Sequence, residues 1–390
     1  MARKGIEVSI AIAEAVGHAD ADIVAAYPIT PQTHIVEHLS ELVADGELDA
    51  EFIPVESEHT AMSCCCGTAA VGARTFTATA SQGLALMHEI LFIASNLRLP
   101  IVMAVANRSL SGPISIWNDH SDVMAERDTG WIQVFVENGQ EAYDHTIASF
   151  RIAEDPRVSL PVAMNFDGFM LSHVIEPIEF LEPEKVRAFL PRQEPLMKLD
   201  VDNPVTMGPV GMPEVYTESK WVQERVLRDS LPVIEEVWRG FEKEFGRAYH
   251  PVETYRADDA ETVLLTMGGL GETAMTCVDK LRDEGQKVGL IKLRLFRPWP
   301  TEALLAAFEG KRAVGIVDRA ISFGGPGGPV ASEIKAMLYS VGERIPVVEF
   351  VAGLGGRDVP VCQFEDMFRS TAKAASGEPV PPYSVIGLRE

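Results

Sequence analysis

Three polar residues with chemically useful side chains, Thr30, Glu58 and Arg108, each follow a predicted strand. Thr30 presents a hydroxyl between two prolines, and Arg108 presents a guanidinium that can bind a carboxylate through two hydrogen bonds. Glu58 lies among small and apolar residues, where a carboxyl group can act as an acid or a base. Because ligands of open α/β sheets bind at the carboxyl ends of strands, the three positions predict a cleft there.

Each of these residues also has a plain structural interpretation. Pro-Thr-Pro sequences serve as simple turns, and an acid at the start of a helix interacts favourably with the helix dipole. Arg108 can equally pair with surface acids, which are abundant in this chain. Glu56 stands two residues before Glu58 and is expected to point elsewhere. Local patterns leave both interpretations open, and the coincidence at one sheet edge favours a site.

Other motifs carry less chemical information. Gly268-Gly-Leu-Gly follows a strand but lacks the spacing of a dinucleotide-binding turn, so we interpret it as a tight strand-to-helix turn. The prolines in Gly324-Gly-Pro-Gly-Gly-Pro remove backbone N–H donors, so we interpret that stretch as a structural loop. Cys64, Cys65 and Cys66 are consecutive on a predicted helix, where neighbours diverge by about 100°, so they cannot converge on one metal.

Composition excludes several functional classes. The 390 residues carry a net charge of −23, which disfavours binding to nucleic acid. No segment approaches the roughly 18 apolar residues of a membrane span, and the N-terminus lacks the apolar core of a secretory signal. Five cysteines without a CxxC motif indicate a reducing cytoplasm and provide no ligand set for an iron–sulfur cluster.

Short β-branched runs alternate with helical patterns along most of the chain, which predicts an α/β fold with parallel sheets covered on both faces. A proline-spaced region follows residue 176 and is expected to be a long connection that ends in a charged surface helix. The predicted helices cover residues 6–16, 33–43, 57 onward, 83–96, 218–247 and 272–284. The predicted strands cover 22–27, 51–55, 74–80, 100–106, 262–267, 288–293, 313–317 and, as the last one, 347–351.

Several longer segments make the chain similar to a known family. They are Tyr27-Pro-Ile-Thr-Pro-Gln-Thr, Glu56-Ser-Glu-His-Thr-Ala-Met, Ala73-Arg-Thr-Phe-Thr-Ala-Thr-Ala-Ser-Gln-Gly-Leu, Asn107-Arg-Ser-Leu, Ile116-Trp-Asn-Asp-His-Ser-Asp, Arg127-Asp-Thr-Gly-Trp-Ile-Gln, Phe296-Arg-Pro-Trp-Pro and Asp318-Arg-Ala-Ile-Ser-Phe-Gly. Together they resemble the α subunit of the multi-subunit 2-oxoacid:ferredoxin oxidoreductases, above all the pyruvate:ferredoxin oxidoreductases (pyruvate synthases). The resemblance covers nearly the whole chain.

This resemblance implies a domain organisation. Residues 1–185 are expected to form the pyrimidine-binding half of a thiamine diphosphate site. Residues 186–257 would connect the two domains and wrap the first one. Residues 258–390 would form a domain like the C-terminal domain of transketolase. The family's diphosphate half binds Mg²⁺ through Gly-Asp-Gly, which this chain lacks. A β subunit is therefore expected to supply that half. The other expected partners are γ and ferredoxin-like δ subunits, and the [4Fe–4S] clusters are expected on partner subunits.

The resemblance also implies residue roles. Glu58 would bond N1′ of the cofactor's aminopyrimidine, with Pro28 and Ile29 beside the cofactor. Thr30 and Arg108 would hold the substrate carboxylate, and no metal ligand is expected on this chain. The implied reaction is oxidative decarboxylation of a 2-oxoacid with CoA, giving acyl-CoA and CO₂ and reducing ferredoxin, with the direction of flux left open.

Alternatives within and outside the family stay open. Gly112 stands where alanine is commoner, so a branched-chain or aryl substrate such as 2-oxoisovalerate or phenylglyoxylate remains compatible. A non-redox thiamine enzyme of transketolase type would share the fold. A non-catalytic scaffold subunit is the third alternative, and Thr30, Glu58 and Arg108 together argue against it.

Overall fold

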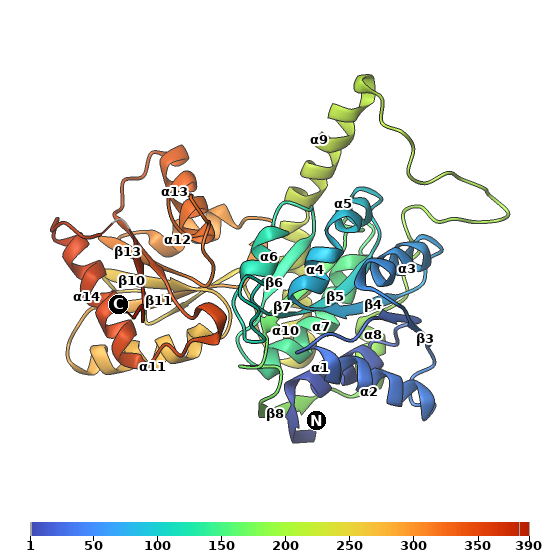
Figure 1. The fold of residues 1–390 in the computed structure, drawn as a ribbon, viewed down its shortest axis with the longest axis horizontal. Coiled ribbons are helices and arrows are strands. Elements are labelled where there is room, and N and C mark those ends of the chain that lie inside the picture. Colours follow the sequence, from blue (N-terminus) through green and yellow to red (C-terminus); the bar gives the residue numbers. More distant parts are fainter. Residues whose placement is uncertain (1, 382, 390) are drawn as a thin grey trace.

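The computed structural model describes residues 2–381 and 383–389 and contains two α/β units side by side (Figure 1). The first unit is built on a seven-stranded sheet with the order β12-β6-β7-β5-β4-β2-β3. All of its strands are parallel to their neighbours except the edge strand β12, which runs antiparallel to β6. Its members are β2 (Ile23–Ala26), β3 (Glu51–Pro54), β4 (Thr75–Thr79), β5 (Ile101–Asn107), β6 (Ile132–Phe135), β7 (Val162–Asp167) and β12 (Leu295–Arg297).

Helices cover both faces of this sheet, as the apolar strands require. One face packs against α1 (Val8–His18), α2 (Thr33–Ala44), α7 (Gly139–Glu154), α8 (Pro183–Phe189) and α10 (Leu231–Phe245). The other face packs against α3 (Glu58–Ala70), α4 (Ser81–Leu86), α5 (His88–Asn96) and α6 (Ser121–Ala125). Every residue of β4, β5, β6 and β7 is buried, which confirms the predicted two-sided parallel sheet.

The N-terminal segment differs from the sequence prediction. A helix was expected from residue 6, but β1 (Ala2–Glu7) is a strand that pairs antiparallel with β8 (Ile175–Phe180). The helix α1 begins only at Val8. The pairing partner lies more than 160 residues away in the sequence, so helical periodicity near residue 6 gave no sign of it.

The connecting region also departs from the prediction of one charged surface helix. Residues 190–212 form an extended loop, and α9 (Pro213–Asp229) projects away from the body of the molecule (Figure 1). The chain turns at Ser230, and α10 then packs against α7. Its side chains Ile234, Trp238 and Phe241 are fully buried. The second half of the predicted surface helix is therefore part of the first unit's core.

The second unit contains a six-stranded sheet in the order β15-β14-β13-β10-β11-β9, parallel except for β9. The strands are β9 (Val252–Tyr255), β10 (Thr262–Thr266), β11 (Val288–Leu293), β13 (Ala313–Asp318), β14 (Val347–Val351) and β15 (Tyr383–Val385). The helices are α11 (Leu270–Asp283), α12 (Thr301–Phe308), α13 (Pro329–Val341) and α14 (Val361–Ala375), with a 3-10 turn at Leu354–Gly356. The prediction that residues 347–351 form the last strand was wrong, because the later strand β15 pairs with them and forms the edge of the sheet.

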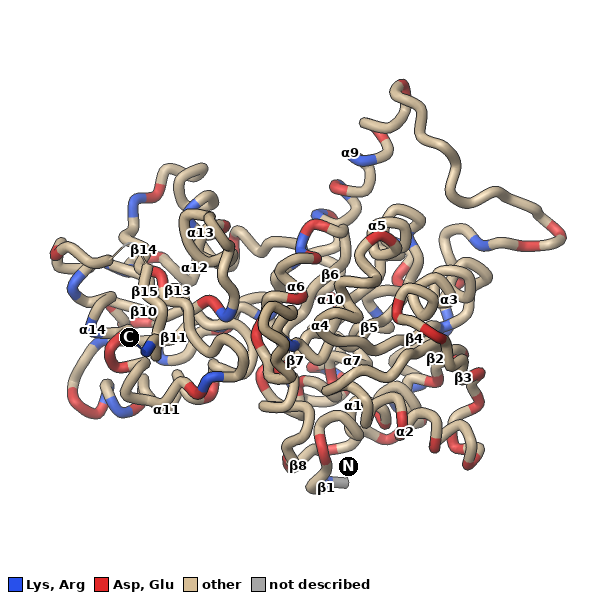
Figure 2. The backbone as a smooth tube through the Cα atoms, viewed as in Figure 1, with Lys and Arg blue, Asp and Glu red and all other residues tan. Residues whose placement is uncertain are grey.

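The two units share apolar and polar contacts. One hydrophobic cluster contains residues of both, among them Trp131, Phe135, Phe296 and Val330. Strand β12 comes from the second half of the chain but joins the first sheet. Acidic residues are spread along the backbone of both units (Figure 2). Within the described residues, no helix has the length and apolar character needed to cross a membrane.

Candidate functional site

The predicted residues lie at one edge of the first sheet. Thr30 follows β2, Glu58 follows β3, and Arg108 follows β5 directly. In the sheet these strands stand in the order β5-β4-β2-β3, with β4 between them. Because the strands are parallel, their carboxyl ends meet at a common edge. The structure thus places the three side chains along the predicted edge.

Glu58 is the first residue of α3 and is only 6% exposed. The helix is capped by Ser57, whose hydroxyl accepts a hydrogen bond from the Thr60 N–H at 3.2 Å. Glu58 is therefore not needed as the cap. Within residues 2–381 and 383–389, no protein donor hydrogen-bonds to its carboxylate. A buried carboxyl group without a protein partner is available to bind a ligand.

A glycine creates the space beside Glu58. Gly83 lies in the first turn of α4, and a Cβ atom there would come within 2.6 Å of Glu58 Oε1 and of Thr79 Oγ1. The Thr79 hydroxyl is itself buried without a hydrogen-bond partner among the described residues. Only glycine at position 83 leaves the carboxylate in its observed place.

Glu56 has a different environment, as expected. Its Oε1 accepts a hydrogen bond from the Thr60 hydroxyl at 2.6 Å, and the side chain is exposed. This hydrogen bond lowers the pKa of Glu56 below its ordinary value. An exposed carboxylate that is held in its charged form by a neighbouring hydroxyl is poorly suited to proton transfer.

Arg108 and Thr30 are in direct contact. Arg108 Nη1 donates to the backbone oxygen of Thr30 at 2.8 Å, and Nε donates to the backbone oxygen of Ser115 at 2.9 Å. Arg108 is 6% exposed, and burial lowers its pKa from the ordinary value. The alternative that Arg108 is a surface ion-pair residue does not describe this geometry, since its side chain binds backbone carbonyls and, among the described residues, no acid.

The loop that carries Thr30 faces outward at the same edge. Pro28 and Thr30 are exposed, and Ile29 is half-buried. Gln32 fixes the loop, because its Nε2 donates to the backbone oxygen of Tyr27 at 2.9 Å. The side chains of residues 28–30 are therefore free to contact a ligand.

Asp122 joins two of these segments and was not predicted. Its Oδ2 accepts from the backbone N–H groups of Arg108 and Ser81, each at 3.0 Å, and its Oδ1 accepts from Asn107 Nδ2 at 3.1 Å. Ser81 starts α4 in the left-handed region, at φ 47°. Burial raises the pKa of Asp122 to about 7. This carboxyl group fixes the backbone at Arg108 and at Ser81, which stands two residues before Gly83.

Gly83 and Asp122 were missed although both lie in the segments that carry the family resemblance. Gly83 offered a signal, since a glycine just after a strand end often marks a close approach. Asp122 offered no such signal, because only the pairing of neighbouring strands in the sheet brings its partners Ser81 and Arg108 close to it.

The first of the glycine motifs is a strand-to-helix turn in the structure, as predicted. Gly268-Gly-Leu-Gly leads from β10 into α11, and the Gly269 N–H donates to Asp167 Oδ2 at 3.0 Å. Asp167 also binds Arg319 and His120, which holds its pKa well below the ordinary value against the effect of burial. These contacts tie the two units together.

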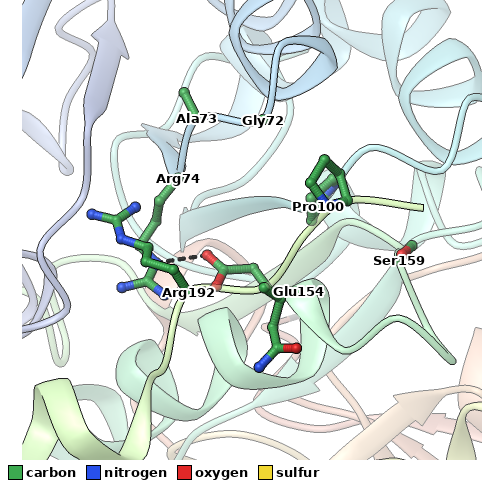
Figure 3. A pocket seen from close by; sticks show the side chains of 9 residues that line it. Gly72, Ala73, Arg74, Pro100, Glu154, Ser159 and Arg192 are labelled. Atoms are coloured by element: carbon green, nitrogen blue, oxygen red, sulfur yellow. Dashed lines mark hydrogen bonds and ion pairs between the residues drawn. The ribbon is translucent and has the colours of Figure 1, made fainter. Parts of the chain in front are cut away.

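A small cavity of about 30 Å³ lies at the opposite edge of the sheet, at the amino end of β4 (Figure 3). Arg74 closes it with two hydrogen bonds to Glu154, from Nε at 2.6 Å and from Nη2 at 2.7 Å. Arg192 lies beside them and pairs with Asp22 at 2.7 Å. The charged groups around this cavity are paired with one another, and the cavity is too small for a cofactor.

Comparison with known families matches two models to the chain. Residues 14–237 match the model described as "Pyruvate flavodoxin/ferredoxin oxidoreductase, thiamine diP-bdg". Residues 260–364 match "Pyruvate:ferredoxin oxidoreductase core domain II". The first match contains Thr30, Glu58 and Arg108, and it is a thiamine diphosphate-binding domain.

Curated relatives cover nearly the whole chain. Pyruvate synthase subunit PorA of Pyrococcus horikoshii is 48% identical over 94% of this chain and 93% of its own length. Ketoisovalerate oxidoreductase subunit VorA of Pyrococcus abyssi is 44% identical over 92% of this chain and 91% of its own length.

Solved structures share the fold. The 2-oxoglutarate:ferredoxin oxidoreductase from Magnetococcus marinus aligns with a TM-score of 0.72 and 18% identity over 94% of this chain, which spans 65% of that chain. A split-gene transketolase aligns with a TM-score of 0.57 and 12% identity, over 96% of this chain and 100% of that one. The expected thiamine-enzyme fold is thereby confirmed. Together with the family models and the curated relatives, this likeness shows that the chain belongs to the pyruvate flavodoxin/ferredoxin oxidoreductase family.

Proposed function

We propose that this chain is the α subunit of a multi-subunit pyruvate:ferredoxin oxidoreductase. The complete enzyme would carry out oxidative decarboxylation of pyruvate with CoA, giving acetyl-CoA and CO₂ and reducing ferredoxin. The observation that carries the proposal is Glu58, a buried carboxyl group without a protein partner among the described residues, in the space that Gly83 leaves.

The residues present fit thiamine diphosphate. Its aminopyrimidine ring presents a basic N1′, and a buried carboxyl group is the partner that such a nitrogen needs. The exposed Pro28 and the half-buried Ile29 follow the neighbouring strand, where they are available to contact the cofactor. When bound, the cofactor supplies the reactive carbon and the electron sink that decarboxylation requires.

The chain's own residues then have distinct tasks. Glu58 holds and shares a proton at N1′. Arg108 has two of its nitrogens bound to backbone carbonyls, which fixes the guanidinium plane and leaves Nη2 for the substrate carboxylate. The Thr30 hydroxyl adds a neutral hydrogen bond beside it. Holding the carboxylate at a defined angle to the reacting bond lowers the entropic cost of decarboxylation.

Partner subunits complete the proposed enzyme. The chain contains neither Gly-Asp-Gly nor CxxC, so we assign the diphosphate and Mg²⁺ half-site to a β subunit. We assign the [4Fe–4S] clusters to partner subunits, among them γ and a ferredoxin-like δ. CoA is a substrate, and ferredoxin is the electron acceptor. All five cysteines are free, which favours assembly in the cytoplasm, where thiols stay reduced.

We also propose a division of labour along the chain. Residues 1–185 form the pyrimidine-side cofactor unit, and residues 258–390 form the transketolase-like unit. Residues 186–257 connect the two units and wrap the first, and they also supply α10 to the first core and the edge strand β9 to the second sheet. The parallel sheet that carries the candidate site supports the first assignment, and the separate six-stranded sheet supports the last.

A branched-chain 2-oxoacid is the second candidate substrate, and the VorA relative favours it. Gly112 does not decide between the two. Its φ is +118°, which favours glycine, and a Cβ there would meet nothing within 4 Å.

The decisive test is to purify the native complex and measure reduction of a low-potential acceptor with a panel of 2-oxoacids. Fastest turnover with pyruvate supports the proposal. Fastest turnover with 2-oxoisovalerate or phenylglyoxylate moves the assignment to another member of the family. Absence of turnover with every 2-oxoacid contradicts a catalytic role.

A further inference from the structure

We propose that Glu7, His34 and His173 of the first unit bind one divalent transition-metal cation such as Zn²⁺. This site is separate from the proposed thiamine site and from its Mg²⁺, and the argument for it does not depend on the proposed function. The cation would be held by two imidazole nitrogens and one carboxylate oxygen, with water in the remaining positions.

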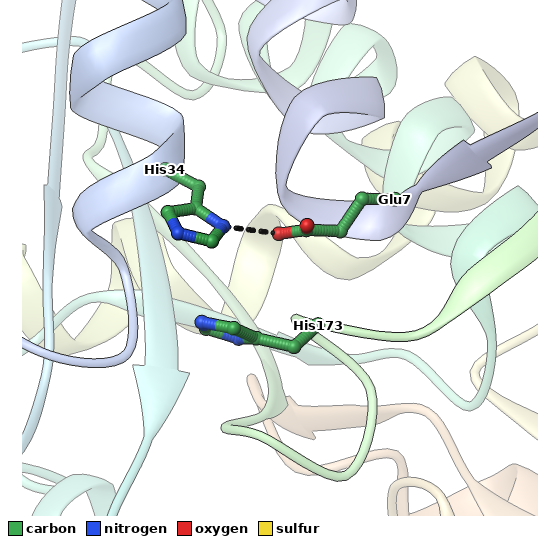
Figure 4. Close-up of side chains that lie close together, drawn as sticks. All are labelled: Glu7, His34 and His173. Carbon is green, nitrogen blue, oxygen red and sulfur yellow. Dashed lines mark hydrogen bonds and ion pairs between the residues drawn. The ribbon is translucent and has the colours of Figure 1, made fainter.

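The three side chains point toward one another from separate segments (Figure 4). Glu7 ends β1, His34 lies in the first turn of α2, and His173 lies in the connection between β7 and β8. One potential ligand atom from each residue lies within 4.8 Å of the others. His34 Nδ1 is 2.6 Å from Glu7 Oε1, so a cation entering here would replace the hydrogen bond between them.

The types of donor select the class of cation. Two imidazoles and a carboxylate suit Zn²⁺ and neighbouring transition metals, whereas Ca²⁺ and Mg²⁺ prefer oxygen ligands. All three side chains are half-buried, which leaves a path for the cation and its water.

A second group positions one of the imidazoles. His173 Nδ1 lies 2.6 Å from the Ser172 hydroxyl, which also accepts the Phe169 N–H at 2.9 Å. Metal-binding histidines commonly use their other nitrogen in such a bond. The His173 ring also packs against Phe169 at 4.6 Å and against His34 at 4.6 Å between ring centroids. The ring is thus oriented before any cation binds.

Bound metal would connect three segments that are distant in sequence. His34 lies in the first turn of the helix that directly follows the Thr30 loop, and the connection carrying His173 follows β7 at the same sheet edge. The cation would therefore fasten the β1–β8 pair to two segments that border the candidate site, which is a structural role.

The test uses the full-length chain after treatment with a chelator. Calorimetric titration with Zn²⁺ is expected to give one site per chain. Either His34→Gln or His173→Gln should weaken the affinity by more than about 10-fold, since loss of even an outer partner costs about 10–100-fold. Glu7→Gln, which preserves size while removing charge, should weaken it too. Thermal melting of each metal-free variant reports whether it folds.

His38→Gln is the matched control, because His38 lies on the same helix and pairs with Glu14 and Glu41 outside the cluster. It should bind Zn²⁺ like the unmodified chain. Co²⁺ as an optical probe should show nitrogen and oxygen ligation without a thiolate band. The proposal is overturned if the unmodified chain lacks a stoichiometric site. It is equally overturned if folded His34→Gln and His173→Gln variants keep full affinity, or if Co²⁺ reports cysteine ligation.

Discussion

At the scale of single residues, the candidate site depends on Glu58, a carboxyl group that has no hydrogen-bond partner among the described residues. Ser57 caps α3, Thr60 binds Glu56, and Glu58 is left buried with a glycine beside it. This separation distinguishes the proposed catalytic acid from its neighbour two residues away. It also gives three substitutions with different expected outcomes.

Glu58→Gln in the assembled enzyme should reduce turnover by roughly 10²-fold or more, because a positioned acid–base group is lost. Glu56→Gln should do much less, since Glu56 is exposed and bound to Thr60. Exchange of the cofactor's C2 proton, followed by NMR, measures the affected step directly. Unchanged exchange in Glu58→Gln would rule out the proposed role.

Gly83→Ala should reduce turnover by about 10²-fold, the effect expected when a reacting group is displaced by about 1 Å. The new methyl group would stand 2.6 Å from Glu58 Oε1, and the flexible end of that side chain is the part that can move. The control is Gly67→Ala on α3, where a Cβ meets nothing within 4 Å. Equal kinetics in the two variants would show that Gly83 does not set the position of Glu58.

Arg108→Ala should lower kcat/KM for the 2-oxoacid more than Thr30→Val. Charged hydrogen bonds contribute about 1.5–3 kcal/mol and neutral ones about 0.5–1.5 kcal/mol. Thr30→Val removes only the hydroxyl and keeps the backbone oxygen that accepts from Arg108. Arg108→Lys should rescue poorly, since an ammonium lacks the planar fork. Steady-state kinetics with each variant checks the order, and intact kinetics in Arg108→Ala would remove Arg108 from the site.

At the scale of elements, Asp122 connects the end of β5 with the start of α4. Burial raises its pKa from 3.8 to about 7, so over this interval the folded chain holds a proton that the unfolded chain releases. The Asp122 contribution to the free energy of unfolding should therefore fall as pH rises from about 4 to about 7. Asp122→Asn should remove this fall.

Urea unfolding of the two proteins across this pH interval measures the difference. The unmodified chain should lose stability relative to Asp122→Asn as pH rises, whatever the absolute cost of the substitution. Asp128→Asn, at an exposed position, is the control and should follow the unmodified chain. Parallel pH profiles for the unmodified chain and Asp122→Asn would contradict the argument.

The elements themselves show what sequence patterns can reveal. A continuous apolar run predicts the buried strand β5, and the carboxyl end of that strand locates Arg108, because both features are local. Strand β1 and the burial of helix α10 were missed because distant partners, β8 and α7, decide their environment. Local sequence patterns could therefore indicate Thr30, Glu58 and Arg108, which each follow a strand. They could not indicate Asp122, because its partners are distant in the sequence.

At the scale of the whole molecule, the chain provides one side of the proposed site. The carboxyl edge of the first sheet contributes Glu58, Thr30 and Arg108, but the sequence contains no Gly-Asp-Gly for a diphosphate-bound Mg²⁺. Much of the binding energy for a diphosphate comes from its charge, and this chain has a net charge of −23. An acidic chain without the metal site has little means of holding that group.

The purified chain alone should therefore bind thiamine diphosphate and Mg²⁺ weakly and show no 2-oxoacid turnover. Addition of a β-type subunit should tighten binding by at least about 10²-fold, because two half-sites then hold opposite ends of one ligand and their effects multiply. Calorimetry with the separate chain and with the reconstituted pair measures this change. The pair carrying Glu58→Gln serves as the control, since its diphosphate side is intact and it should retain most of the gain. Tight, Mg²⁺-dependent binding by the isolated chain would show that the diphosphate site lies on this chain after all, and the division of the site between subunits would have to be abandoned.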